Sequence, residues 1–364
     1  MHTIKVKLQN CSYNIVVGNN ILRLLGGKLR KLKLGKSAYV ITNTAIKNRY
    51  GELLNKSLKE SGFKIRFKLV PDTEKSKAIE MASSIIKDLA CYDKRKQVFI
   101  IAFGGGVVGD LASFIASIYK RGIPCVQLPT TLLAQVDSSI GGKTAVDLAQ
   151  GKNLVGTFYQ PRLVFSDVAI LLSLDRRQLK TGLAEVVKYG IIKDYALFSY
   201  LEKNYRDILN LKESALEFIV SRCSKIKAAV VREDEREEKG IRTILNFGHT
   251  IGHAIEAAGN YKRYNHGEAV ALGMLVASDI SAKLGLLKNS DRVKIDNLIK
   301  ALGLPVKIKR ISLKKVINAH YRDKKFIGSI NKFVLAAGIG KTKIVKNIPL
   351  VVIKEALCKL VLGS

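Results

Sequence analysis

A continuous apolar segment that runs into a cluster of glycines constrains the fold more than any other feature of the chain. Residues 97–103 (QVFIIAF) have the character of a strand buried on both faces, as in a parallel sheet covered by helices. The glycine-rich stretch 104–110 (GGGVVGD) and a helical pattern follow directly. Glycines allow close backbone approach and a helix N-terminus offers free amides, so this order predicts a phosphate-binding loop. The spacing is not GxGxxG, and a plain tight turn is the alternative interpretation.

The two halves of the chain differ in their apolar patterns. Strand-like segments occupy 3–8, 13–17, 38–42, 64–70, 125–128 and 163–165, with a helical pattern over 77–90, so a parallel sheet is expected. Helical patterns dominate afterwards, over 176–203, 212–232, 248–259, 267–285, 290–302 and 350–361. We therefore expect an α/β, Rossmann-like dinucleotide-binding domain over 1–174 and a mostly α-helical domain over 175–364.

The composition is globular, with 47% hydrophobic and 25% charged residues, but the net charge of +32 is unusual. Nucleic-acid binding is one explanation of the charge. The basic residues are nevertheless spread along the chain, no basic stretch is interleaved with aromatics, and no zinc-finger spacing occurs. We expect no nucleic-acid partner, and note that a positive field attracts small anionic substrates.

The cysteines and the N-terminus bear on the compartment. The five cysteines are far apart and include no CxxC pair, which predicts reduced thiols and a cytoplasmic location. The first residues (MHTIKVKLQN) lack an apolar signal core, and no run of about 18 apolar residues occurs, so we expect no membrane association.

A second glycine site lies at 137–144 (DSSIGGKT), followed by Lys152 and Asn153. Asp137, Lys143 and Lys152 lie near glycine turns there, and lysines and an amide in that setting suit phosphate or carboxylate groups. Either lysine alone also fits an ordinary solvated surface position.

Three of the five histidines, His249, His253 and His266, are close in sequence. His249 and His253 are four apart and share a helix face, so spacing alone nominates these two as metal ligands. Zn²⁺ commonly binds imidazoles with a carboxylate, and Glu185 is the candidate, with Lys188 on the same face. Spacing does not distinguish a ligand from a base, and a polar cluster beneath a loop is the alternative.

Seven motifs follow one another along nearly the whole chain: GGGVVGD, LPTTLLAQVDSSIGGKTAVD, GKNLVGTFYQP, GLAEVVKYG, LNFGHTIGHAIE, HGEAVALGM and RDKK. In this order they closely resemble the 3-dehydroquinate synthase family of the shikimate pathway. The resemblance implies a homodimeric lyase that converts 3-deoxy-D-arabino-heptulosonate 7-phosphate to 3-dehydroquinate and phosphate, using catalytic NAD and one divalent metal, Zn²⁺ or Co²⁺. Another sugar phosphate cyclase, or a metal-dependent polyol dehydrogenase on the same fold, is the alternative.

The resemblance also implies roles for individual residues. It makes Glu185, His249 and His266 the metal ligands, and His253 a proton-handling residue. The implied NAD contacts are Asn43, Asp72, Glu74, Lys77, Gly105, Gly106, Val107, Val108, Gly109, Asp110, Thr130, Thr131, Lys143 and Lys152. The implied catalytic and substrate contacts are Lys188, Lys227, Glu238, Arg242, Asn246, His253, Arg121, Asp137, Lys143, Asn153 and Lys324 or Lys325.

Two of these positions carry a further implication. In the family the equivalent of Arg121 reaches into the neighbouring subunit. One extra residue between Lys227 and Arg242 leaves open whether Glu238 or Glu237 fills the acidic position.

Overall fold

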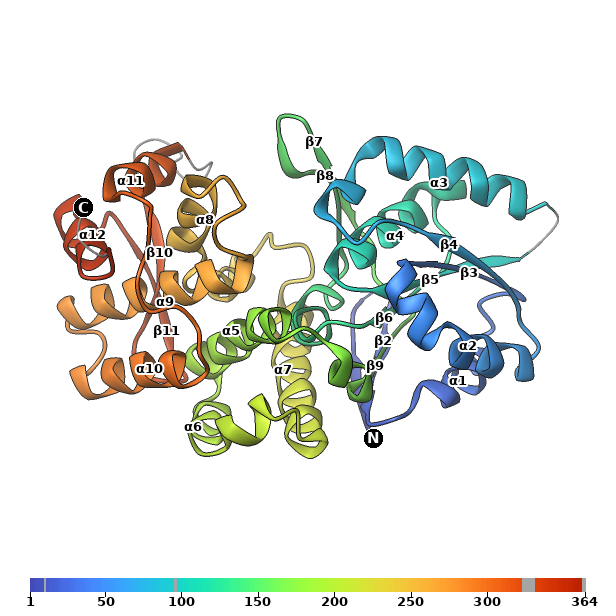
Figure 1. Cartoon of the computed structure of the whole chain (residues 1–364), viewed down its shortest axis with the longest axis horizontal. Helices are drawn as coiled ribbons and strands as arrows, with labels where there is room; N and C mark the ends of the chain where they lie inside the picture. Colours follow the sequence, from blue (N-terminus) through green and yellow to red (C-terminus); the bar gives the residue numbers. More distant parts are fainter. Residues whose placement is uncertain (10, 95–96, 323–330, 362–364) are drawn as a thin grey trace. The chain divides into compact units, whose positions relative to one another are not determined.

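The computed structural model describes residues 1–9, 11–94, 97–322 and 331–361, which form two compact units (Figure 1). The first unit is Met1–Leu174 with Leu216–Arg236, and the second is Asp175–Ala215 with Glu237–Ser364. The first division falls between Leu174 and Asp175, while the exchange of Leu216–Arg236 has no counterpart in the predicted domains 1–174 and 175–364. The functional roles of the two domains stay predictions.

The first unit is built on a sheet that has seven strands within the described residues. Its spatial order is β1 (His2–Val6), β2 (Tyr13–Gly18), β9 (Leu163–Asp167), β6 (Cys125–Pro129), β5 (Val98–Gly104), β3 (Ser37–Thr42) and β4 (Lys64–Leu69). β1 and β2 pair antiparallel as a hairpin, and every other neighbouring pair is parallel. The predicted α/β class is confirmed.

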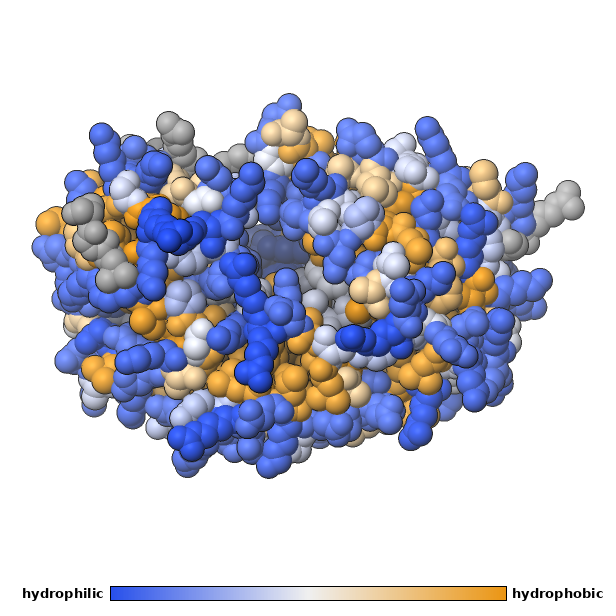
Figure 2. Space-filling view, in the orientation of Figure 1, coloured by the Kyte–Doolittle hydropathy of each residue, from blue (hydrophilic) through white to orange (hydrophobic). Residues whose placement is uncertain are grey.

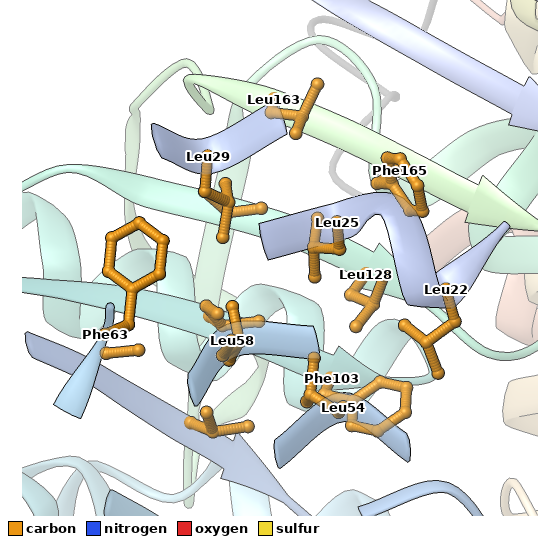
Figure 3. Packing of buried hydrophobic residues seen from close by; sticks show 14 of the residues in the cluster. Leu22, Leu25, Leu29, Leu54, Leu58, Phe63, Phe103, Leu128, Leu163 and Phe165 are labelled. Atoms are coloured by element: carbon orange, nitrogen blue, oxygen red, sulfur yellow. The ribbon is translucent and has the colours of Figure 1, made fainter. Parts of the chain in front are cut away.

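Strand β5 shows why an uninterrupted apolar segment suits the middle of this sheet. Phe99, Ile101 and Phe103 join the core under α1 (Leu25–Leu32) and α2 (Thr44–Glu60), as Figure 3 shows for Phe103. The intervening Ile100 and Ala102 join the core under α3 (Ile79–Tyr92) and α4 (Gly106–Ile118). Successive side chains of a strand point to opposite faces, so both faces bury apolar surface. Each fully buried large side chain contributes about 1.5–3 kcal/mol to stability.

The other elements of the first unit are short, apart from α7. They are η1 (Leu22–Leu24), η2 (Glu74–Lys77), η3 (Tyr119–Arg121), η4 (Ala134–Ser138), the antiparallel hairpin of β7 (Lys143–Leu148) and β8 (Gly151–Phe158), and η5 (Val168–Ser173). Most of α7 (Glu213–Glu233) belongs here too, because the Met1 ammonium lies 2.9 Å from the Glu217 carboxylate and Gln160 Nε2 donates to Glu235 just beyond the helix.

The second unit is mostly helical, as predicted. Its elements are α5 (Arg176–Lys193), α6 (Tyr195–Leu209), η6 (Ile241–Asn246), α8 (His249–Ala258), α9 (His266–Lys283), α10 (Asn289–Ala301), α11 (Leu313–Arg322), the hairpin of β10 (Lys332–Ala336) and β11 (Thr342–Lys346), and α12 (Leu350–Cys358). The single helical segment predicted over 176–203 was wrong, because Asp194 ends α5 and its side chain caps α6 by accepting from Leu197 N. None of the described helices combines the length and the apolar character that a membrane crossing requires.

Candidate functional site

The residues predicted to bind NAD gather at one edge of the first unit's sheet. Asn43 follows β3, Gly105 follows β5, Thr130 follows β6 and Asp72 follows β4, so all lie at the carboxyl ends of parallel strands. After β3 the chain moves outward to β4 and then returns to β5 on the other side of β3. The strand order therefore reverses between β3 and β5, where sheets of this kind bind dinucleotides.

The glycine turn joins β5 to α4 directly, with only Gly105 between the strand and the helix. A Cβ on Gly104 would lie 2.6 Å from Val108 Cβ, and one on Gly109 would lie 3.1 Å from the Gln127 side chain on β6. These two glycines thus let the helix pack against the sheet. No side chain among the described residues caps the N-terminus of α4, so its first amides are available to a phosphate. Asn43, by contrast, already caps α2 by accepting from Ile46 N at 2.8 Å.

Lys77 contacts two other residues of the predicted site in the first unit, Asp110 and Asn153. Its Nζ lies 2.8 Å from Asp110 Oδ2 and also donates to Asn153 Oδ1, although only 4% of the side chain is exposed. Burial acts to lower the pKa of Lys77, but the charge and hydrogen bond of Asp110 outweigh it and leave the pKa above its ordinary value. Burial in turn raises the pKa of Asp110, and Lys77 only partly offsets that rise. Lys77 is therefore held as a fixed cation.

Lys227 makes the corresponding contact with Asp137. Its Nζ donates to the Asp137 backbone oxygen at 2.6 Å and to Oδ1 at 2.8 Å. Lys143 begins β7 with an exposed side chain, and Lys152 lies 3.5 Å from Glu74 at the surface. Arg121 is exposed at the end of η3.

In the second unit a carboxylate and two imidazoles converge from α5, α8 and α9. Glu185 is fully buried, and its Oε1 lies 3.4 Å from His249 Nε2 and 3.4 Å from His266 Nε2. One ligand atom from each of the three side chains lies within 4.8 Å of the other two. Lys188, one turn further along α5 and 2% exposed, forms an ion pair with Glu185.

Glycines permit this convergence. A Cβ on Gly267, the residue after His266, would lie 2.3 Å from the backbone oxygen of Thr181 on α5. A Cβ on Gly273 would lie 1.9 Å from the backbone oxygen of Gly248, which precedes α8 with a φ of +79°. Because these residues lack side chains, α9 approaches both α5 and the start of α8 closely enough to bring the three side chains together.

His249 is held in the tautomer that can donate the Nε2 lone pair to a metal ion. Its Nδ1 lies 3.2 Å from the carbonyl oxygen of Phe247, which can only accept, so Nδ1 carries the proton and Nε2 faces Glu185 without one. Burial lowers the pKa of His249 well below its ordinary value, since the surrounding charges only partly compensate. A neutral imidazole with a free Nε2 is the form that binds metal ions.

His266 shows that the site attracts positive charge. Burial disfavours the charged ring, but hydrogen bonds to Glu185 and Glu256 prevail and raise the pKa of His266 to about 10. Its Nδ1 lies 3.5 Å from Glu256 Oε2. The same carboxylates that favour a proton on this ring would favour a divalent cation. One carboxylate and two imidazoles form a donor set that fits Zn²⁺ or Co²⁺ and leaves a coordination position open.

Comparisons with known proteins identify the family of the chain. The family model described as 3-dehydroquinate synthase N-terminal matches residues 67–181, and the one described as 3-dehydroquinate synthase C-terminal matches residues 182–326. The chain belongs to the 3-dehydroquinate synthase family. A 3-dehydroquinate synthase of Desulforamulus reducens is 47% identical and covers 96% of this chain and 97% of its own length. One from Caldanaerobacter subterraneus is 46% identical, with 95% and 97% covered.

Solved structures of two other cyclases share the fold. A 2-deoxy-scyllo-inosose synthase complexed with carbaglucose-6-phosphate, NAD⁺ and Co²⁺ has a TM-score of 0.89 at 26% identity, covering 98% of this chain and 100% of its own. A 2-epi-5-epi-valiolone synthase from Streptomyces hygroscopicus with NAD⁺ and Zn²⁺ bound has a TM-score of 0.87 at 26% identity, with 97% and 98% covered. The family resemblance seen in the motifs is thus confirmed.

The remaining predicted residues of the second unit lie in several environments. Arg242 is 2% exposed, and its Nε lies 3.6 Å from Glu237 Oε1. Which of Glu237 and Glu238 fills the acidic position stays a prediction. The His253 ring lies 5.5 Å from that of His249 and 6.1 Å from that of His266, between centroids. Asn246 is half-buried at the end of η6. Lys324 and Lys325 lie outside the described residues.

Glu256 was missed by reasoning from the sequence. The only signal for it was its spacing, seven residues after His249 and three after His253, which places it on their face of α8.

Proposed function

We propose that this chain converts 3-deoxy-D-arabino-heptulosonate 7-phosphate to 3-dehydroquinate and phosphate, with NAD regenerated in each turnover. The observation that carries the proposal is the convergence of Glu185, His249 and His266 beside the buried Lys188. Membership of the family supports the same reaction.

The two cofactors fit the residues present. Glu185, His249 and His266 would hold the divalent cation, and the carboxyl edge of the sheet in the first unit would hold NAD. When bound, NAD supplies a hydride acceptor that is reduced and reoxidised within one turnover, and the cation supplies stabilisation of developing alkoxide charge. His249 would contribute its Nε2 lone pair to the cation, with its proton held on Nδ1 by the Phe247 carbonyl oxygen.

The other polar and charged residues would bind the substrate, and the lysines and the arginine among them would pair with its anionic groups. The proposed contacts are Lys143, Asn153, Asp137, Lys188, Lys227, Arg242, Asn246 and Lys324 or Lys325. Each charge-assisted hydrogen bond is worth about 1.5–3 kcal/mol, so several together would fix one conformer through successive steps. His253 would transfer protons to and from the substrate. Glu237 would orient the Arg242 guanidinium.

The test is an assay of purified protein with substrate, substoichiometric NAD⁺ and Zn²⁺. We expect phosphate release with many turnovers per NAD⁺, no net NADH, and loss of activity when a chelator removes the metal. Net NADH formation would instead identify a polyol dehydrogenase. Turnover of a phosphorylated sugar that lacks the carboxylate, without turnover of the heptulosonate, would identify another cyclase.

We further propose a cytoplasmic homodimer in which Arg121 serves the neighbouring subunit's site. The five cysteines, all among the described residues, are free thiols, which fits a reducing compartment. If the proposal holds, mixing two inactive variants, Arg121→Ala and Lys188→Met, recovers about a quarter of wild-type activity, because half of random dimers are mixed and each has one intact site. No recovery after exchange of subunits would show that Arg121 serves its own subunit, and a fully active Arg121→Ala variant would show that it serves neither.

A further inference from the structure

The two imidazoles at the metal centre are held in the same manner. His249 Nδ1 faces a backbone oxygen, that of Phe247, at 3.2 Å, and His266 Nδ1 faces Glu256 Oε2 at 3.5 Å. Each ring consequently presents Nε2 to Glu185 Oε1, at 3.4 Å in both cases. Metal-binding histidines in proteins usually have the second nitrogen bound to an acceptor in this way, which fixes both tautomer and ring orientation.

Glu256 is placed for this contact by the periodicity of α8. It lies on the same face as His249, two turns along, and as His253, one turn along. Its side chain is 13% exposed, so most of the carboxylate is removed from water. His253, Glu256 and His266 form a second group whose ligand atoms lie within 4.8 Å of one another, and His266 belongs to both groups.

We propose that Glu256 is the positioning residue of the metal centre. Its carboxylate accepts the Nδ1 proton of His266 and holds the ring so that Nε2 binds the cation. This inference rests on the proposed function, because the cation is the one that the reaction would use. An anionic acceptor raises the basicity of the imidazole more than a neutral carbonyl does, so His266 is the stronger of the two imidazole ligands.

A second cation in the group of His253, Glu256 and His266 is the competing explanation of the same geometry. It would require His266 to lose both ring protons and to bridge two ions. The positioning role requires only the neutral ring, so the observations favour it.

The experiment compares wild type with Glu256→Gln, which keeps the size of the side chain and removes its charge. Glu202→Gln is the matched control, because Glu202 is a partly buried glutamate on α6 of the same unit. Co²⁺ binding to metal-free protein is titrated by visible absorption in competition with a chelator, ions per chain are counted, and the thermal midpoint of metal-free protein is measured. Glu256→Asp serves as the conservative variant.

We expect Glu256→Gln to bind Co²⁺ about 10–100-fold more weakly than wild type, while the metal-free variant still unfolds in one cooperative transition above the temperature of the titration. Glu256→Asp should recover part of the affinity, Glu202→Gln should match wild type, and wild type should bind one ion per chain. Unchanged Co²⁺ affinity in Glu256→Gln would overturn the proposal, as would two ions per wild-type chain or a metal-free variant that is already unfolded at the temperature of the titration. If wild type binds Co²⁺ but does not turn over, the proposed function fails while this inference still stands.

Discussion

At the scale of single residues, the metal centre depends on how the negative charge of a buried carboxylate is compensated. Glu185 is fully buried, and the cation next to it on α5 is the equally buried Lys188. Removing one partner of a buried ion pair leaves an uncompensated charge, which typically costs about 3–5 kcal/mol. A divalent ion bound by Glu185 would provide the same compensation, so Lys188 and the ion would both act on the Glu185 carboxylate.

The variant Lys188→Met tests whether the lysine and the metal ion compensate the same carboxylate. We expect the metal-free variant to be less stable than wild type, because Glu185 loses its positive neighbour. Zn²⁺ should then raise the thermal midpoint of the variant by more than it raises that of wild type, while turnover falls sharply. Calorimetry with and without Zn²⁺ measures both shifts. Equal shifts would show that the lysine and the ion do not act on the same carboxylate.

Some residues of this centre could be predicted from the sequence and others could not. His249, His266 and Glu185 lie in recognisable motifs, and the structure brings their ligand atoms together. Spacing alone had paired His249 with His253, because four residues make one turn, yet His266 comes from another helix and no local period predicts that. Glu256 resembles any helical glutamate until the His266 ring is placed beside it.

At the scale of elements, the start of α9 decides where His266 lies. Asn265 caps the helix in a reciprocal arrangement with Glu268, and Arg177 of α5 donates two hydrogen bonds of 2.8 Å to the same glutamate. Together with the close approach at Gly267, these contacts fix the first turn of α9 against α5. The position of the metal ligand His266 therefore depends on how α9 packs against α5.

Gly267→Ala tests that dependence. The added Cβ would meet the backbone of Thr181, which has little freedom to move, so α9 must shift. We expect a loss of about 1–3 kcal/mol, typical of overpacking, together with weaker Zn²⁺ binding. Thermal unfolding and metal titration measure the two effects. Gly27→Ala on α1, where a Cβ meets nothing within 4 Å, is the control and should be as stable as wild type or more so.

The predicted elements were accurate where a pattern was long or had only one explanation. The apolar run at β5, the hairpin of β1 and β2 and the helices α8, α9 and α10 were all predicted. The hairpin of β10 and β11 was not predicted, because its two short strands lie among helices, without the neighbouring strand signals that supported equally short strands in the first half. Strands β7 and β8 were not predicted either, because the glycines and lysines in and around them had been interpreted as a binding loop.

At the scale of the whole molecule, the charge of +32 is the property that stands out. Hydrophilic side chains cover most of the face seen in Figure 2, with apolar ones between them. A field of this sign raises the encounter rate of a substrate that carries a phosphate and a carboxylate, and salt screens it over about 8–10 Å.

We therefore expect kcat/KM for the heptulosonate phosphate to fall several-fold from low to physiological ionic strength while kcat stays constant. Steady-state kinetics in two chemically different salts measures the trend and separates screening from specific ion binding. A kcat/KM that does not change with salt would mean that the surface charge has no part in substrate capture. Retention of duplex DNA at physiological salt would then support a nucleic-acid partner.

Helix α7 has a consequence for how the protein is made. Its residues from Leu216 onward complete the first unit, yet they are translated after residues 175–215 of the second. A nascent chain that ends at Leu174 still lacks Glu217, Lys227 and Glu235, which bind Met1, Asp137 and Gln160. The first unit is therefore complete only after residues 175–215, the opening segment of the second unit, have been synthesised.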